Sequence, residues 1–170
     1  TNFSTWNCQS LGVRSDGSIN PVKKAYVRQL IKKNRGLIIL TETRHIQHEA
    51  KKIKWQNQMR TILHTPSRNW NQDFPQALQD TNTLNARGNL LPDVPEANVG
   101  SRGGGGIIIV ASNEYTIMQS ETLCRGHCLI SQMAKNREKP FFLVAAYAST
   151  GTQHQRTFWK QMEQGISDFI

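Results

Sequence analysis

The sequence predicts a mixed α/β fold, and three features of its 170 residues support that prediction. Apolar runs of strand length recur along the chain, and the strongest are 37–40 and 107–110. At the start of the chain, a strand-like segment is followed by a basic amphipathic helix and then by an entirely apolar strand, which is the pattern of a βαβ unit. No run approaches the roughly 18 apolar residues of a membrane-spanning helix. We therefore expect a single α/β domain.

Three strands and two helices are expected before residue 65. Residues 3–8 have a strand-like composition, and Asn20-Pro21 indicates a helix N-cap followed by proline at the first helical position. Apolar residues at helical spacing then predict a helix that ends near Gly36. The apolar run 37–40 predicts a strand buried on both faces. A short helix and a further strand are expected over 45–58 and 59–64.

The second half is expected to begin with a long surface excursion over 65–102. This stretch holds four prolines and has too few apolar residues for a core of its own. Gly103–Gly106 then leads directly into the apolar strand 107–110. Further strands are expected over 114–118, 128–134 and 141–147. A helix is expected over 152–170, with an apolar stripe formed by Phe158, Trp159, Met162, Ile166 and Phe169.

The positive charge is concentrated in one segment of the chain. The net charge is +9, and residues 22–60 hold eleven basic residues and two acidic ones. A basic surface attracts polyanions, and neutralising phosphates is the sequence-independent part of nucleic-acid binding. The segment therefore predicts a contact with nucleic acid, and a solvated helix face is the alternative.

Composition also excludes several classes of protein and suggests a compartment. There is no glycine period and no sustained heptad, so collagen-like and coiled-coil folds are excluded. The three cysteines cannot all pair with one another, which argues against a disulfide scaffold. Free thiols fit a reducing environment, so the nucleus or the cytoplasm is the expected location.

Polar residues follow two of the expected strands at their carboxyl ends. Asn7 comes directly after Phe3–Trp6, and Glu42 comes directly after Leu37–Thr41. Polar groups at such positions line the functional crevice of an α/β sheet, and carboxylate and carboxamide oxygens are ligands that Mg²⁺ prefers. Arg44 would point to the same side as Glu42 in an extended segment and could hold a phosphate. The spacing predicts a metal and phosphate site, with ordinary strand-end polar residues as the alternative.

Four motifs in order along the chain resemble the endonuclease/exonuclease/phosphatase superfamily. Residues 5–11, Thr-Trp-Asn-Cys-Gln-Ser-Leu, are similar to its first motif, and residues 40–44, Leu-Thr-Glu-Thr-Arg, to its second, whose Glu coordinates the catalytic metal. Residues 103–110 resemble its glycine-led central strand. Residues 145–150 resemble its tyrosine motif, after which a helix follows. The residues of these motifs are most similar to those of the endonuclease domains of LINE-type (non-LTR) retrotransposons.

The resemblance implies a fold, a reaction and a set of site residues. The fold would be a two-sheet α/β sandwich of the DNase I-like type, and the reaction Mg²⁺-dependent hydrolysis of a phosphodiester, with nicking of DNA as the first choice and RNA as the alternative substrate. Mn²⁺ is the alternative ion. Glu42 and Asn7 would hold the metal and act in catalysis with Tyr147. The residues expected to contact phosphate or nucleic acid are Arg44, Gln9, Arg156, Lys23 and Lys24.

The resemblance covers only the N-terminal part of that domain. Its later motifs are missing, because no Asp-x-Asn occurs after Thr150 and no Asp-His pair occurs anywhere in residues 1–170. The water-activating histidine and its aspartate are therefore expected further along a larger polypeptide, and residues 1–170 alone are expected to be inactive. Two other functions stay open: a nucleic-acid-binding module without catalysis, and a phosphatase or sphingomyelinase of the same superfamily. Zinc sites around His45 or Cys124 are disfavoured because their ligand sets are incomplete.

Overall fold

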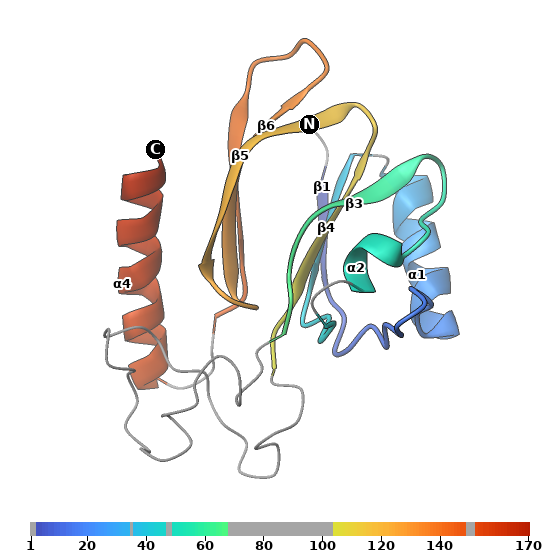
Figure 1. The fold of residues 1–170 in the computed structure, drawn as a ribbon, viewed down its shortest axis with the longest axis horizontal. Helices are drawn as coiled ribbons and strands as arrows, with labels where there is room; N and C mark the ends of the chain where they lie inside the picture. The colour runs from blue at the N-terminus through green and yellow to red at the C-terminus, as the bar shows by residue number, and fades with distance from the viewer. Residues whose placement is uncertain (1–2, 35, 47–48, 68–103, 149–151) are drawn as a thin grey trace.

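Two β-sheets face each other, and helices cover their outer faces (Figure 1). The computed structural model describes residues 3–34, 36–46, 49–67, 104–148 and 152–170.

The first sheet contains, in spatial order, β1 (Phe3–Asn7), β2 (Leu37–Thr41), β4 (Ile107–Ser112) and β3 (Met59–Thr65). The second contains β5 (Tyr115–Cys124), β6 (Cys128–Lys135) and β7 (Phe141–Ala146). The helices are α1 (Pro21–Lys33), α2 (Glu49–Lys52) and α4 (Thr152–Phe169). The two sheets with helices outside them agree with the predicted α/β sandwich, and its DNase I-like type stays a prediction.

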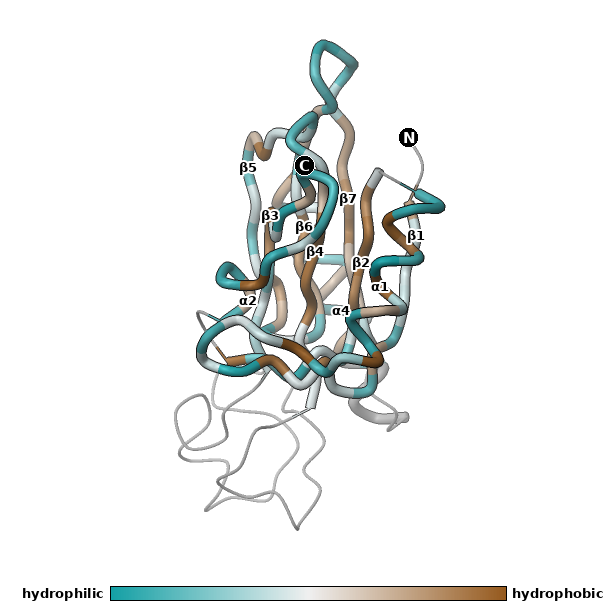
Figure 2. The backbone as a smooth tube through the Cα atoms, turned by 90° about the vertical axis from the view of Figure 1, so that its right-hand side faces the viewer, coloured by the Kyte–Doolittle hydropathy of each residue, from teal (hydrophilic) through white to brown (hydrophobic). Residues whose placement is uncertain are grey.

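Three hydrophobic clusters hold these layers together. Successive side chains of a strand point to opposite faces, so Ile38 and Leu40 pack towards α1, while Leu37 and Ile39 pack towards the second sheet. β4 divides its side chains in the same way, which is why Figure 2 shows both central strands as hydrophobic along their length. A third cluster lies between the second sheet and α4. The predicted burial of β2 on both faces is confirmed.

The βαβ opening forms as the sequence predicts. The side-chain oxygen of Asn20 accepts hydrogen bonds from the backbone N–H groups of Val22 and Lys23, at 3.0 and 3.3 Å, and Pro21 begins α1. β1 and β2 pair in parallel, as the helical crossover requires. The helix ends slightly before the predicted glycine: Asn34 makes the last helical bond, to the carbonyl of Leu30, and its own backbone is extended, with φ −145° and ψ 103°.

Two expectations about the second half are wrong in detail. β5 continues to Cys124, well beyond 118, and keeps its pairing with β6 through two irregularities in register. In the predicted apolar stripe of α4, Phe158 is fully buried but Trp159 is 53% exposed. One residue on a helix turns the side chain by about 100°, which takes Trp159 off the face that packs on the sheet.

The expected excursion over 65–102 lies outside the described residues except for its first three. These belong to the packed structure: Thr65 is the last residue of β3, and both Thr65 and Ser67 are buried. The excursion therefore cannot begin before residue 68. Within the part of the chain that is described, no helix has the length and apolar character needed to cross a membrane.

Candidate functional site at one edge of the sandwich

The carboxyl ends of β1, β2 and β7 lie at the same edge of the sandwich, at the bottom of Figure 1. The parallel pairing of β1 and β2 continues beyond the strands, because Ser10 N–H donates to the carbonyl of Glu42 at 2.8 Å and Leu11 N–H to that of Thr43 at 3.1 Å. The segments that follow the two strands therefore run side by side. This confirms that the residues after Asn7 and those around Glu42 meet at one edge.

A hydrogen bond between the two sheets defines the centre of this edge. The hydroxyl of Tyr147, just after β7, donates to Oε1 of Glu42 at 2.7 Å, and the two residues are 105 positions apart in the sequence. Glu42 is half-buried. The sequence named both residues as candidates, and the structure brings them together.

His127 fixes the position of Tyr147. The N–H of Tyr147 donates to the carbonyl of His127 at 2.7 Å, and Nδ1 of His127 lies 2.7 Å from the carbonyl oxygen of Tyr147. A carbonyl can only accept, so Nδ1 carries the proton, and a neutral imidazole then presents Nε2 as an acceptor. In the sequence, His127 was considered only as part of the disfavoured zinc site at 124–128, and no local pattern marks this contact.

Lys23 holds the segment that follows β1. Its ammonium donates to the carbonyl oxygens of Cys8 at 2.6 Å and Gln9 at 2.9 Å, and also to that of Ser10. An ammonium has three N–H donors, so all of them are used within the chain. Lys23 was expected to contact phosphate, and the structure gives it the different role of fixing this backbone.

The segment that Lys23 holds has an unusual backbone. Gln9 and Ser10 have φ of 47° and 74°, which non-glycine residues adopt uncommonly. Oδ1 of Asn7 accepts the N–H of Gln9 at 3.1 Å and stabilises the turn. Burial raises the pKa of the Cys8 thiol to about 12, which the charge of Lys23 opposes and that of Glu42 reinforces. Both charged groups therefore lie near Cys8.

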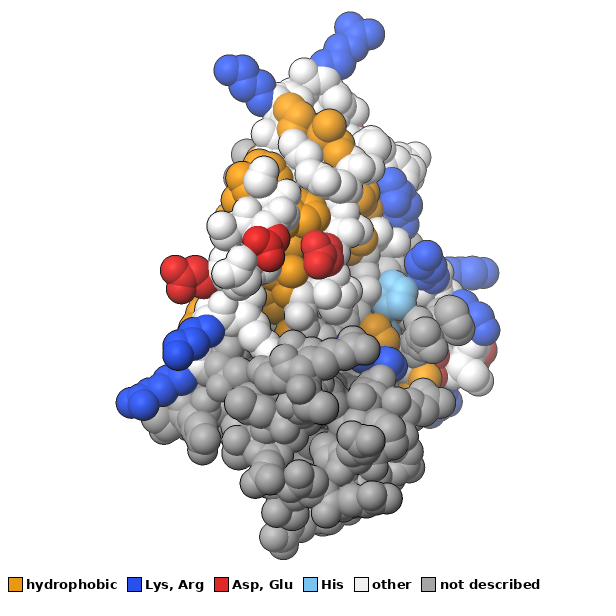
Figure 3. Space-filling model, turned by 60° about the vertical axis from the view of Figure 1, so that its left-hand side comes forward, with side chains coloured by type: hydrophobic (Ala, Val, Ile, Leu, Met, Phe, Trp, Pro, Cys, Tyr) orange, Lys and Arg blue, Asp and Glu red, His pale blue; other side chains and the backbone are white. Residues whose placement is uncertain are grey.

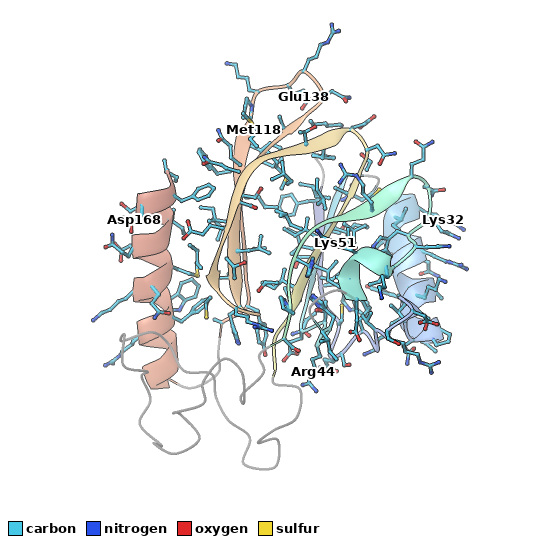
Figure 4. All side chains as sticks on the ribbon, viewed as in Figure 1. Lys32, Arg44, Lys51, Met118, Glu138 and Asp168 are labelled. Atoms are coloured by element: carbon cyan, nitrogen blue, oxygen red, sulfur yellow. The ribbon has the colours of Figure 1, made fainter. Side chains whose placement is uncertain are left out.

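The segment after β2 is not extended, so the reason given for placing Arg44 beside Glu42 is wrong. Glu42 and Arg44 have φ of 51° and 52°, in the left-handed region. The backbone curls around a glycine pair, with Thr43 N–H donating to Gly106 at 3.1 Å and Arg44 N–H to Gly105 at 2.9 Å. The side chain of Arg44 is nevertheless exposed at the same edge (Figure 4).

The glycines before β4 allow this close approach. Gly105 and Gly106 have φ of 90° and 98°. A Cβ on Gly106 would lie 2.5 Å from Oγ1 of Thr43, and one on Gly105 would lie 2.6 Å from the carbonyl oxygen of Gly126. Only glycine fits such positions. The glycine-led strand of the sequence therefore lets the segment after β2 and the β5–β6 turn converge at this edge.

A network of buried and partly buried hydrogen bonds stabilises this edge. Oγ1 of Thr43 and Nδ1 of His45 share a hydrogen bond of 2.6 Å, and Nε2 of His45 and Nδ1 of His64 share one of 3.1 Å. Ser67 donates to the carbonyl of His45 through both its N–H, at 3.0 Å, and its hydroxyl, at 3.1 Å. The sequence did not predict this network. Residues 41–45, Thr-Glu-Thr-Arg-His, are polar without interruption, so no pattern in them marks the three that take part or lie buried.

Glu42 and Asn7 have the donor chemistry for a magnesium ion. Tyr147 occupies one carboxylate oxygen of Glu42, which leaves the other, and the amide oxygen of Asn7 has a second lone pair. Mg²⁺ keeps several waters and needs few protein oxygens, so this pair fits it. Over the described ranges, no group of three or more His, Cys, Asp and Glu residues could hold a metal.

The remaining predicted residues are one neighbour of Asn7 and two cations on helices. Gln9 is exposed beside Asn7. Lys24 is partly exposed on α1, and Arg156 is exposed on α4. Among the described contacts, no hydrogen bond joins either of these two cations to Glu42.

No protein-family model matches the chain, and no curated protein sequence matches it. The function must therefore be argued from the residues and geometry of this edge.

Proposed function

We propose that this edge is the active site of a metal-dependent phosphodiesterase that nicks DNA, in a DNase I-like domain of the kind found in LINE-type retrotransposons. The observation that supports it most is the 2.7 Å hydrogen bond from Tyr147 to Glu42. This bond joins the residues of two separate motifs across the sandwich, at the edge where polar groups follow the strands.

Each residue of the edge has a proposed role that follows from its chemistry. Glu42 and Asn7 hold Mg²⁺ through hard oxygens. The bound ion supplies charge neutralisation for a phosphate oxygen. Tyr147 presents a hydroxyl that can turn from Glu42 to a phosphate oxygen, and Arg44 supplies a positive charge to the same group. The general base is proposed to come from a later part of the polypeptide.

Replacing Glu42 by glutamine tests the proposal in a polypeptide that continues past residue 170. The variant keeps the shape of the side chain and removes the charge, so nicking of supercoiled plasmid should fall by roughly 100-fold or more. Glu138→Gln is the matched control, since Glu138 is exposed beyond the far end of the second sheet (Figure 4). Activity near that of the wild type at saturating Mg²⁺ would remove Glu42 from the metal site.

The basic residues of α1 and α2 favour one alternative, a nucleic-acid-binding module without catalysis. Binding of DNA without Mg²⁺-dependent nicking by the longer polypeptide would support it. Hydrolysis of small phosphoesters in preference to plasmid DNA would instead indicate a phosphatase or sphingomyelinase.

A further inference from the structure

The outer face of the first sheet is predominantly positive. α1 and α2 both lie on this face, and Lys32 and Lys51 project from them in Figure 4. We call this surface the α1–α2 face. Its exposed or partly exposed cations include Lys24, Arg28, Lys32, Lys51, Lys52 and Lys54.

Three of these cations form a stripe along α1. Lys24, Arg28 and Lys32 are spaced four residues apart, so they share one side of the helix. Tyr26 is on the opposite flank, where its ring packs on Trp6 of the edge strand β1 at a centroid distance of 4.5 Å. The stripe therefore lies on the flank away from β1, which is the flank towards α2.

Within the described residues, few acidic side chains oppose the charge of the α1–α2 face. Glu49 on α2 is buried and accepts the N–H of Ile46 at 2.8 Å. Asp16 accepts hydrogen bonds from the N–H and hydroxyl of Ser18, at 2.9 and 2.7 Å, and keeps its charge as an exposed acid in the loop that Lys52 contacts. The other exposed acids of the described chain belong to the second sheet, its turns and α4: Glu114, Glu121, Glu138, Glu163 and Asp168. Figure 3, with the α4 side forward, accordingly shows acidic and basic side chains together.

Apolar groups do not accompany the stripe either. The apolar side of α1, with Val27 and Ile31, is buried in the core, so it is not available to enter a lipid bilayer as an amphipathic surface helix would. Exposed Val22 is on the flank of Tyr26, away from the stripe. A protein interface has an apolar centre depleted in charge, and this surface has neither property. A polyanion with regular charges and no need for apolar contact fits it best.

We infer that the α1–α2 face binds the phosphodiester backbone of the nucleic acid on one side of the edge that carries Glu42. The stripe begins next to Lys23, which reaches the backbone of that edge, and runs away from it along α1. Its eight residues of rise span about 12 Å, the axial length of about three to four phosphates of one strand. The direction of the path rests on the proposed function, and the binding does not.

The test is the salt dependence of binding to a fluorescein-labelled 20-base-pair duplex, measured by anisotropy in EDTA. Lys24, Arg28 and Lys32 are replaced together by glutamine. The control replaces Arg137, Lys139 and Lys160 by glutamine. These residues are exposed on the β6–β7 turn and on α4, so both variants lose the same charge. Each lost phosphate contact lowers the slope of log K against log[salt] by about 0.9. When the salt is raised from 50 to 200 mM, the affinity of the wild type should therefore fall by a factor about 40 times larger than that of the stripe variant.

The outcomes separate this inference from the proposed function. A reduced slope in the stripe variant alone supports the inference, even if the polypeptide never nicks DNA. Equal slopes in the two variants overturn it, as would a stripe variant that stops binding phosphatidylserine vesicles while keeping the wild-type slope on DNA. If the triple variant does not fold by circular dichroism, Lys51→Glu with Lys54→Glu tests the same face from α2, and an unchanged slope there also overturns it.

Discussion

Replacing Lys23 by methionine should destabilise the fold although the residue lies on the surface of a basic helix. Methionine keeps most of the side-chain length and removes only the ammonium. That ammonium bonds to the carbonyls of Cys8, Gln9 and Ser10, and the bonds to Cys8 and Ser10 are partly buried. A hydrogen bond to a charged group contributes about 1.5 to 3 kcal/mol, and we use the lower value because water reaches part of the site.

Two partly buried bonds then predict a loss of about 3 kcal/mol in the free energy of unfolding. The measurement is urea denaturation followed by circular dichroism. Lys33→Met is the matched control, because Lys33 is exposed on the same helix, and it should change the free energy by less than about 0.5 kcal/mol. A loss under about 1 kcal/mol for Lys23→Met, or equal losses in both variants, would refute the structural role of Lys23.

Three further predictions follow from the same structure. Gly106→Ala should destabilise the fold by about 2 kcal/mol or more in the same urea assay, since its Cβ would lie 2.5 Å from Oγ1 of Thr43 at a φ of 98°; a neutral effect would contradict the close approach. Burial raises the pKa of Cys8 and of Cys128 to about 12, from 9.0, so the unfolded thiols ionise first and the free energy of unfolding should hold to about pH 9 and fall above it. In urea melts between pH 8 and 10, the free energy of unfolding should decrease less in a variant with both Cys8→Ala and Cys128→Ala than in the wild type. An equal decrease would argue against the raised pKa values. Residues 1–170 alone should not nick plasmid DNA in Mg²⁺, and nicking by that chain would place the general base within it, with His127 the first residue to replace.

Much of the fold was predictable because its signals are local. Asn20-Pro21 starts α1 through hydrogen bonds within three residues of the cap. The continuous apolar run of β2 indicated a strand covered on both faces, and it is. Asn7 and Glu42 were placed at one edge because parallel strands end on the same side of a sheet. In each case the identity and spacing of a few neighbouring residues decide the outcome.

The sequence by itself determined the order of strands and helices, the basic character of α1, and which residues follow the strands at the candidate site. Only the tertiary structure decided what those residues touch. Arg44 and Glu42 were expected in extended backbone, but their positive φ arises from contact with a glycine pair more than sixty residues away. Lys23 and Lys24 are alike in sequence, and only the first meets the carbonyls after β1. The bond between Tyr147 and Glu42 depends on how two sheets stack, and stacking is set by the packing of whole layers, which a local pattern does not encode.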